Sequence, residues 1–317
     1  RGMGKCCVSG AGAINVDYKA RTVEIDGIVL KEGDFISING TTGEVYNGKV
    51  ETKAAEVSGD FADLMALCEK HTKLVVRTNA DTPHDAKVAR DFGAVGIGLC
   101  RTEHMFFEAE KIVAMREMIL SPDAEGRKKA LAKLLPYLKA DFYGIFKAMD
   151  GCPVNVRLLD PPLHEFVPHD LKGQEEMAAA MGVSVQTIKQ RVESLCEANP
   201  MLGHRGCRLG NTYPEITEMQ TRAILGAAIQ LKKEGGDPHP EIMVPLTGIL
   251  YEFEAQEKVI RATAAELFAE EGIEIPFKVG TMIEIPRAAL TANRIASRAE
   301  YFSFGTNDLT QMTFGYS

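Results

Sequence analysis

Continuous apolar runs alternate with amphipathic stretches from about residue 60 onward. Six of these runs predict strands, over residues 74–81, 94–103, 153–160, 241–246, 277–285 and 301–308. Between them, segments such as 218–235 and 252–272 repeat apolar side chains at helical spacing. Runs that are apolar at every position are typical of strands buried on both faces of a parallel sheet covered by helices. The pattern therefore predicts an α/β fold.

At least six β-α units in succession favour a (β/α)₈ barrel over an open doubly wound sheet. The chain ends at Ser317, inside a helix expected after the last run, and it begins at Arg1 without a methionine. We therefore expect a fragment, with a TIM-type barrel that is truncated at its C-terminal end.

The first fifty residues follow a different pattern. Short β-branched runs are separated by D-G, E-G-D and N-G, which predicts short strands and tight hairpins. The glycine-rich start, residues 2–13, could be a phosphate cradle, but it has neither G-x-G-x-x-G nor P-loop spacing, so turns are favoured.

After a charged segment at 50–59, apolar residues recur at helical spacing in the run 60–71. This change of pattern predicts a domain boundary near 55–60. We assign residues 1–58 to a small β-rich domain with its linker and residues 59–317 to the incomplete barrel.

Amino-acid composition and net charge limit the class of protein and the partners that it can have. Of the 317 residues, 45% are apolar and 25% charged, which is typical of soluble globular proteins. The net charge of −8 argues against nucleic acid as a partner. The seven cysteines form no C-x-x-C pair, which indicates a reducing compartment. No apolar run approaches the ~18 residues of a membrane helix. A cytoplasmic location without membrane contact is expected, and a plastid or glycosome stays open.

Polar residues gather where the predicted strands end. In a barrel these ends form one rim, which carries the functional groups. The candidates are Arg101, Glu103, His104, Arg157, Asp160, Arg205, Arg208, Glu284, Asn307 and Asp308.

Structural explanations stand beside the functional ones. An arginine near a strand end commonly pairs with a nearby carboxylate, which would give the pairs Arg101–Glu103 and Arg157–Asp160. Asn307 and Asp308 could equally be N-caps of a helix.

Glu284 is harder to explain structurally. It lies between two isoleucines in an apolar strand, and Pro286 after it suits the first position of a helix. A buried carboxylate must be paired or bound to a cation. Together with Asp308 it offers a hard oxygen pair suited to Mg²⁺, and the converging arginines suit a phosphate or carboxylate. The residues predict a pocket for a small anion chelated to magnesium.

The sulfur and imidazole candidates are weaker. Cys100 precedes Arg101 and should face the core. His164 and His169 lie in a Pro-rich loop without the spacing of a zinc helix, so a surface role is favoured. The role of His104 is left open.

Several strings resemble the PEP-utilising enzymes, and within them the pyruvate, phosphate dikinase family. The strings that resemble their PEP/pyruvate barrel are "GLCRTEHMFF", "RLLDPPLHEF", "GHRGCRL", "GTMIEIPRA" and "FSFGTNDLTQMTFGYS". The segment 20–46 resembles the end of their swivelling phosphohistidine domain. The resemblance extends over essentially the whole chain.

The resemblance implies a phosphotransferase that interconverts pyruvate, ATP and phosphate with phosphoenolpyruvate, AMP and pyrophosphate through a phosphohistidine. It implies that Glu284 and Asp308 bind Mg²⁺. The implied catalytic residues are Arg101, Arg157 and Asn307, and the implied substrate-binding residues are Arg101, Arg157, Arg205, Glu284, Ser303, Gly305, Thr306, Asn307 and Asp308. The implied partners are pyruvate or phosphoenolpyruvate, the enzyme's own phosphohistidine domain and, in the full-length form, a second copy.

The chain departs from the family pattern at both ends. The carrier histidine would precede Arg1 and the acid/base cysteine would follow Ser317, so we expect no activity from these residues alone. Enzyme I of the sugar phosphotransferase system and phosphoenolpyruvate synthase share parts of the pattern and are the nearest alternatives. A Mg²⁺-dependent lyase or aldolase acting on a pyruvate enolate is an alternative of another class.

Overall fold

The computed structural model of the chain describes residues 7–52, 59–160, 162–196 and 199–315. The chain divides into two compact units, Arg1–His71 and Thr72–Ser317, which are described separately. Parts of the glycine-rich start and of the predicted linker, residues 1–6 and 53–58, lie outside the described residues. The predicted domain boundary at 58 stays a prediction.

The first unit is built from short antiparallel strands, as the turn pattern predicts. One sheet has the order β1 (Asn15–Asp17), β2 (Thr22–Ile25) and β3 (Ile28–Lys31). Strands β2 and β3 are joined by Asp26 and Gly27, which have φ angles of 49° and 80°. Positive φ at both positions is what a two-residue hairpin turn requires, so the D-G signal is confirmed.

A second hairpin and one helix complete this unit. The hairpin pairs β4 (Ile36–Ile38) with β5 (Val45–Asn47). Helix α1 (Asp60–His71) occupies the predicted helical run and belongs to the first unit.

The second unit is a parallel α/β structure with one six-stranded sheet. Its strands follow one another in chain order across the sheet, and every neighbouring pair is parallel. They are β6 (Thr78–Asn79), β7 (Ile97–Arg101), β8 (Pro153–Arg157), β9 (His239–Val244), β10 (Lys278–Ile283) and β11 (Phe302–Phe304). Five of them lie within a predicted run, and β9 overlaps the run 241–246 but begins two residues earlier, so a strand is confirmed for each of the six runs.

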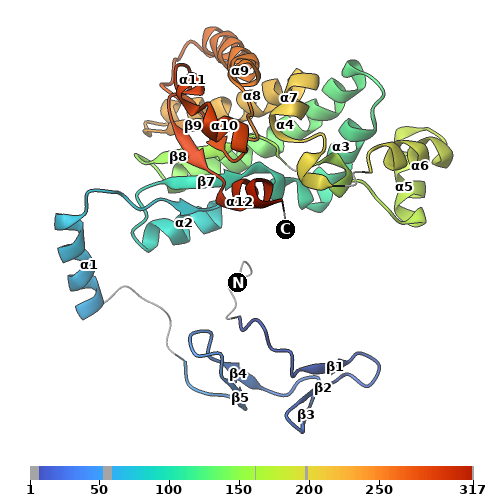
Figure 1. The fold of residues 1–317 in the computed structure, drawn as a ribbon, viewed down its shortest axis with the longest axis vertical. Coiled ribbons are helices and arrows are strands. Elements are labelled where there is room, and N and C mark those ends of the chain that lie inside the picture. Colours follow the sequence, from blue (N-terminus) through green and yellow to red (C-terminus); the bar gives the residue numbers. More distant parts are fainter. Residues whose placement is uncertain (1–6, 53–58, 161, 197–198, 316–317) are drawn as a thin grey trace. The chain divides into compact units, whose positions relative to one another are not determined.

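Helices connect successive strands, and the long ones pack together on the outside of the sheet (Figure 1). Helix α4 packs on α8, and α8 packs on α9. The α-helices of this unit are α2 (Pro83–Asp91), α3 (Ala109–Leu120), α4 (Ala124–Ala148), α5 (Leu171–Met181), α6 (Val185–Ser194), α7 (Gly206–Thr212), α8 (Pro214–Lys233), α9 (Leu250–Glu271), α10 (Pro286–Leu290), α11 (Ala292–Ile295) and α12 (Thr306–Phe314). Short 3₁₀ turns are η1 (Thr102–Phe107), η2 (Leu163–Glu165) and η3 (Pro200–Leu202).

Side chains that cross the sheet show that it is strongly curled. Arg77, just before β6, makes a 2.6 Å ion pair with Glu241 on β9. Tyr301, just before β11, donates a 3.0 Å hydrogen bond to Asn155 on β8. Each contact joins strands three positions apart, about 14 Å in a flat sheet, where perpendicular side chains would not meet. The sheet is therefore a half-barrel, consistent with the predicted TIM-type fold.

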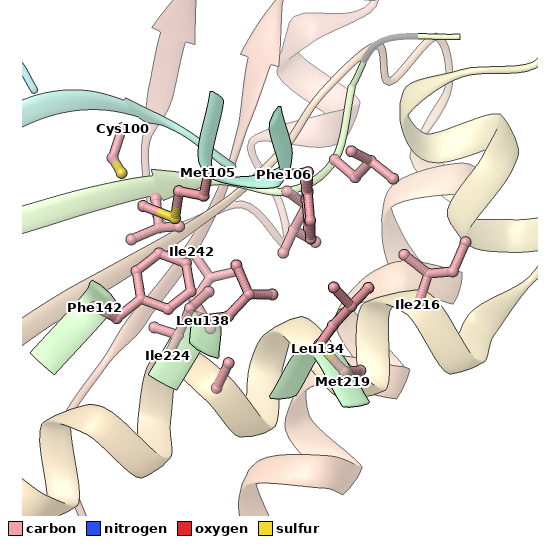
Figure 2. Packing of buried hydrophobic residues seen from close by; sticks show 14 of the residues in the cluster. Cys100, Met105, Phe106, Leu134, Leu138, Phe142, Ile216, Met219, Ile224 and Ile242 are labelled. Atoms are coloured by element: carbon pink, nitrogen blue, oxygen red, sulfur yellow. The ribbon is translucent and has the colours of Figure 1, made fainter. Parts of the chain in front are cut away.

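The core lies between this sheet and helices α4 and α8 (Figure 2). Phe142 and Leu138 of α4 and Ile224 of α8 are fully buried against the strands. Cys100 is also fully buried, and burial raises the pKa of its thiol well above the ordinary value. The prediction of a core thiol is confirmed.

The first run differs from the prediction. Only Thr78 and Asn79 of residues 74–81 form a strand, and Leu74 remains 83% exposed. The reason is position, because β6 lies at one edge of the sheet and pairs only with β7. Strand β11 at the other edge is also short and half-exposed. In the described residues, no helix has the length and hydropathy of a membrane span.

Candidate functional site

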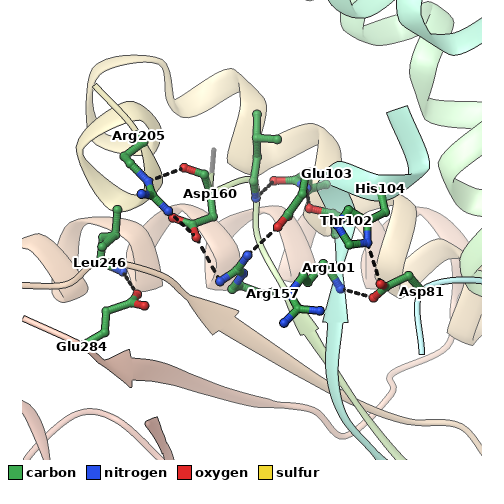
Figure 3. A network of polar contacts seen from close by, with 12 residues as sticks. Asp81, Arg101, Thr102, Glu103, His104, Arg157, Asp160, Arg205, Leu246 and Glu284 are labelled. Atoms are coloured by element: carbon green, nitrogen blue, oxygen red, sulfur yellow. Dashed lines mark hydrogen bonds and ion pairs between the residues drawn. The ribbon is translucent and has the colours of Figure 1, made fainter. Parts of the chain in front are cut away.

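Two arginines lie side by side where neighbouring strands end. Arg101 is the last residue of β7 and Arg157 the last of β8, and their Cα atoms are register partners (Figure 3). Because parallel strands end at the same edge, the segments after β7, β8, β9 and β10 also meet here. The structure therefore contains the rim that the sequence predicts, at the edge where these strands end.

Two carboxylates hold the Arg157 guanidinium. It pairs with Glu103 of η1 and, at 2.9 Å, with Asp160. Arg157 is only 8% exposed, and burial by itself would lower its pKa, but the two carboxylates outweigh burial and raise it. Arg157 is a fixed cation whose donors have set directions.

Asp160 extends this network to the next segment of the chain. Its Oδ2 also accepts a 2.9 Å hydrogen bond from Arg205, whose Nε donates to the Asp160 carbonyl oxygen at 3.1 Å. The pair Arg157–Asp160 is therefore confirmed. The pair Arg101–Glu103 is wrong, since Glu103 reaches across to Arg157 on the adjacent strand.

Arg101 has a different environment. Its backbone N–H donates to Asp81 Oδ1 at 2.6 Å, and the other Asp81 oxygen lies 2.7 Å from His104 Nδ1. The half-buried Arg101 guanidinium makes no hydrogen bond or ion pair with any residue that the structure describes. The sequence reading assigned no role to Asp81, although its position at the end of the run 74–81 was the same signal that identified the other rim residues.

Glu284 follows β10 and is fully buried. Its Oε1 accepts a 2.7 Å hydrogen bond from the backbone N–H of Leu246, and its Oε2 is buried without a hydrogen-bond partner. Burial and then the negative charge of Asp160 raise the pKa of Glu284 to about 8. Asp308 raises it further, whereas the Leu246 N–H and Arg157 lower it. The carboxyl group lacks the counter-charge that its burial requires.

The turn after β11 approaches this carboxyl group. A Cβ atom on Gly305 would lie only 2.6 Å from Glu284 Oε2, so only glycine leaves room here. Gly305 is the N-cap of α12, and the helix starts at Thr306. The prediction of Asn307 and Asp308 as N-caps is wrong, because both lie inside the first turn.

The remaining predicted residues lie along the same turn. Ser303 is half-buried in β11, while the side chains of Thr306 and Asn307 are exposed. None of the three side chains forms a hydrogen bond within the described part of the chain. The structure therefore places them near Glu284 in the fold without assigning them a contact.

The sequence matches the family described as PEP-utilising enzyme, PEP-binding domain, over residues 55–317. This chain belongs to the PEP-utilising enzymes. It is 57% identical over its whole length to the pyruvate, phosphate dikinase of Giardia intestinalis and 54% identical to that of Clostridium symbiosum. It is 56% identical to the chloroplastic pyruvate, phosphate dikinase of Flaveria pringlei. The chain spans 36%, 36% and 34% of the length of these relatives.

The carboxylates of this PEP-utilising enzyme chain fit a divalent cation. The orphaned Glu284 Oε2 needs a positive partner, and Asp308 contributes a second charge without an ion pair to any described residue. No group of three or more His, Cys, Asp or Glu side chains suited to a metal occurs in the described ranges. Mg²⁺ commonly takes one or two protein carboxylates and fills its other positions with water and substrate oxygens. A two-carboxylate site therefore suits Mg²⁺.

A pocket of about 1000 Å³ opens beside Glu284. Leu246 and Ile285 line it next to the carboxylate, and Met201 and Met312 give it an apolar wall. Arg208 borders it and donates to the carbonyl oxygen of Gly203 at 2.9 Å. Its guanidinium thereby supports the wall of the pocket.

The two predicted surface histidines do not join the site. His169 is exposed and contacts the carbonyl oxygen of His164 through its Nε2 at 3.0 Å. His164 is half-buried. His104, left open in the sequence, pairs with Asp81 at the edge of the rim.

Proposed function

We propose that this chain is the pyruvate/phosphoenolpyruvate-binding part of a phosphotransferase. The whole enzyme interconverts pyruvate, ATP and phosphate with phosphoenolpyruvate, AMP and pyrophosphate through a phosphohistidine. The support is the shared family and the three relatives named above, all pyruvate, phosphate dikinases matched over the full chain. These relatives favour a dikinase over enzyme I, phosphoenolpyruvate synthase or a lyase, because all three are named pyruvate, phosphate dikinase.

One observation carries the proposal. The fully buried Glu284 keeps an unpartnered oxygen at the same strand ends that hold a network of arginines. A buried anion without a partner destabilises the fold, and a bound cation compensates for it. A dianionic substrate bridging this cation and the arginines would be held from both sides.

In this proposal the arginines bind and orient the substrate. The Arg101 guanidinium has no carboxylate partner among the described residues, so in this proposal it binds the transferring phosphoryl group. Arg157 and Arg205 are fixed by Asp160, so they supply donors in set positions. Fixed charges stabilise a developing anion without reorganisation when the reaction occurs.

Glu284 and Asp308 would hold Mg²⁺, which acts as a Lewis acid toward the oxygens of pyruvate and stabilises their negative charge. Gly305 lets the chain approach closely, and the first-turn N–H groups of α12 face the same end of the sheet. Thr306, Asn307 and Ser303 would contact the ligand from this turn. Asn307 would be catalytic through its amide, together with Arg101 and Arg157.

The partners of the whole enzyme follow from the same proposal. Residues 1–58, which hold the hairpins of the first unit, would belong to a phosphohistidine domain that delivers the phosphoryl group to the barrel. We propose a homodimer for the full-length protein. Because some relatives are named as chloroplastic, the cytoplasmic location stays a prediction.

Oxalate, an analogue of the pyruvate enolate, tests the site by calorimetric titration with and without Mg²⁺. We expect Mg²⁺-dependent binding that Glu284→Gln abolishes, because the amide cannot neutralise the cation. The matched control is Glu241→Gln, which alters another buried carboxylate, on β9, that pairs with Arg77. This control should bind within about twofold of the wild type. Equal binding by wild type and Glu284→Gln would refute the site assignment.

A further inference from the structure

Leu246 has a backbone conformation that its side chain disfavours. Its φ angle is 58°, in the left-handed region that L-residues other than glycine, asparagine and aspartate rarely adopt. Of the described residues, Arg21, Asp26 and Leu246 share a positive φ without being glycine, and the first two belong to exposed hairpins. Leu246, by contrast, is 1% exposed. Strain retained in a core is an indication of function.

Contacts from two neighbouring segments hold this conformation. On one side, Cys207 of α7 donates its backbone N–H to the Pro245 carbonyl oxygen at 3.0 Å and its Sγ–H to the Leu246 carbonyl oxygen at 3.1 Å. On the other, Thr281 of β10 donates to the Val244 carbonyl oxygen at 2.7 Å. The carbonyl groups from 244 to 246 are therefore all fixed.

Gly206 makes the space for the Leu246 side chain. A Cβ atom at Gly206 would lie 2.8 Å from Leu246 Cβ, and Gly206 itself has a φ of 57°. Its N–H donates to the Asp160 carbonyl oxygen at 3.1 Å, which ties this packing to the arginine network. The left-handed turn is thus built into the walls of the site.

The consequence of the turn is the direction of one N–H group. The Leu246 N–H points at Glu284 Oε1 and binds it at 2.7 Å, as Figure 3 shows. The other oxygen, Oε2, then faces Gly305 at the junction of β11 and α12. The hydrogen bond therefore holds the carboxylate so that its second oxygen is left facing this junction.

We propose that Leu246 is a positioning residue: its left-handed backbone fixes Glu284 Oε1 so that Oε2 is presented to the cation. This role rests on the proposed function of Glu284 as a metal ligand. It explains why a strained residue is retained in the core beside an orphaned carboxylate oxygen.

Two substitutions separate positioning from simple packing. Leu246→Ile keeps the volume and the apolar character, but a β-branched residue is strongly disfavoured at positive φ. Leu246→Asn loses apolar packing, yet asparagine tolerates the left-handed region. If Leu246 acts only through packing, Leu246→Ile should disturb the site less than Leu246→Asn. If Leu246 positions Glu284, Leu246→Asn should disturb the site less than Leu246→Ile.

The first measurement is the Mg²⁺ affinity of the full chain by titration calorimetry, with thermal unfolding to confirm that each variant is folded. We expect Leu246→Ile to weaken binding at least about tenfold, as is typical when support of a metal ligand is lost, and Leu246→Asn to bind more tightly than Leu246→Ile. Equal affinities, or tighter binding by Leu246→Ile, would overturn the proposal.

A second measurement needs neither metal binding nor a folded variant at position 246. Amide proton exchange and the NMR shift of the Leu246 N–H are compared in the wild type and Glu284→Ala, without metal. We expect a protected, downfield amide in the wild type that loses both properties in Glu284→Ala. An amide unchanged by Glu284→Ala would overturn the proposal. If the wild type binds no Mg²⁺ but the Leu246 amide changes in Glu284→Ala, the proposed metal-binding function is wrong, while the orientation of Glu284 by Leu246 is retained.

Discussion

At the scale of single residues, the site is defined by an imbalance of charge around Glu284. Burial and Asp160 raise its pKa to about 8, and one N–H together with the nearby Arg157 only partly compensates. Arg157, in contrast, has two carboxylates of its own. Arg157 and Arg205 are therefore held by carboxylates, whereas Glu284 Oε2 and the Arg101 guanidinium are left without a partner among the described residues.

The raised pKa of Glu284 predicts how stability depends on pH without metal. A carboxyl group whose pKa rises from 4.5 to about 8 on folding favours the folded state below pH 4.5. That contribution, up to about 5 kcal/mol, is lost as pH rises through about 8. Urea unfolding of wild type and Glu284→Gln in EDTA measures it. The wild type should lose stability relative to the variant between pH 5 and 8, and a constant difference would contradict the assignment.

Arg101 and Arg157 should differ sharply when each is replaced by methionine. Arg157→Met leaves the buried Glu103 without a cation and Asp160 with Arg205 alone, and it should cost about 3 kcal/mol of unfolding free energy. Arg101→Met removes a guanidinium without a carboxylate partner and should cost no more than about 0.5 kcal/mol, while weakening oxalate binding. Urea unfolding compares the two. Similar losses of stability would show that the ion-pair network is not the structural part of the site.

At the scale of elements, the hydrophobic pattern predicted every strand of the six-stranded sheet, but it did not predict which strands lie at the edges of that sheet. The run 277–285 is largely apolar and its strand β10 has a neighbour on both sides, whereas the apolar residues 74–76 remain exposed at the edge. A single sequence does not reveal which strand has a neighbour on both sides. For the same reason the sequence identified Arg157 and Glu103 as rim residues without showing that they pair across strands.

Two details were beyond sequence reasoning for physical reasons. The left-handed turn at Leu246 has no local signal, because contacts from distant segments enforce it. The start of α12 was placed too late, since Gly305 takes the N-cap position in order to pass Glu284 closely. The Leu246 turn and the start of α12 both lie at the proposed site, where the requirements of function conflict with local conformational preference.

A pair of glycines tests the curled sheet. A Cβ on Gly280 of β10 would lie 2.5 Å from the ring of Tyr301, whose hydroxyl bonds Asn155 across the sheet. Gly280→Ala should therefore destabilise the fold by about 1–3 kcal/mol. Gly226→Ala in α8 is the matched control, because its Cβ would meet Lys139 no closer than 3.5 Å. That change should stabilise the helix by about 0.5–1 kcal/mol. Equal effects in urea unfolding would contradict the cross-sheet packing.

At the scale of the whole molecule, the second unit brings together residues far apart in the chain. Arg101, Arg157, Arg205, Glu284 and Asp308 come from the ends of four strands, β7, β8, β10 and β11, and the segments that follow them. Parallel strands make this possible, since every strand delivers its following segment to the same rim. The proposed chemistry thus depends on the curl of the sheet as much as on any side chain.

Manganese, which replaces Mg²⁺ in oxygen-ligand sites, locates the cation directly. Crystals of the chain grown with Mn²⁺ and oxalate would show the ion by anomalous scattering. We predict one peak bonded to Glu284 Oε2 and to Asp308, with oxalate completing the coordination and facing Arg101. An ion bound elsewhere, or a peak at the rim that Glu284 does not contact, would contradict the central claim.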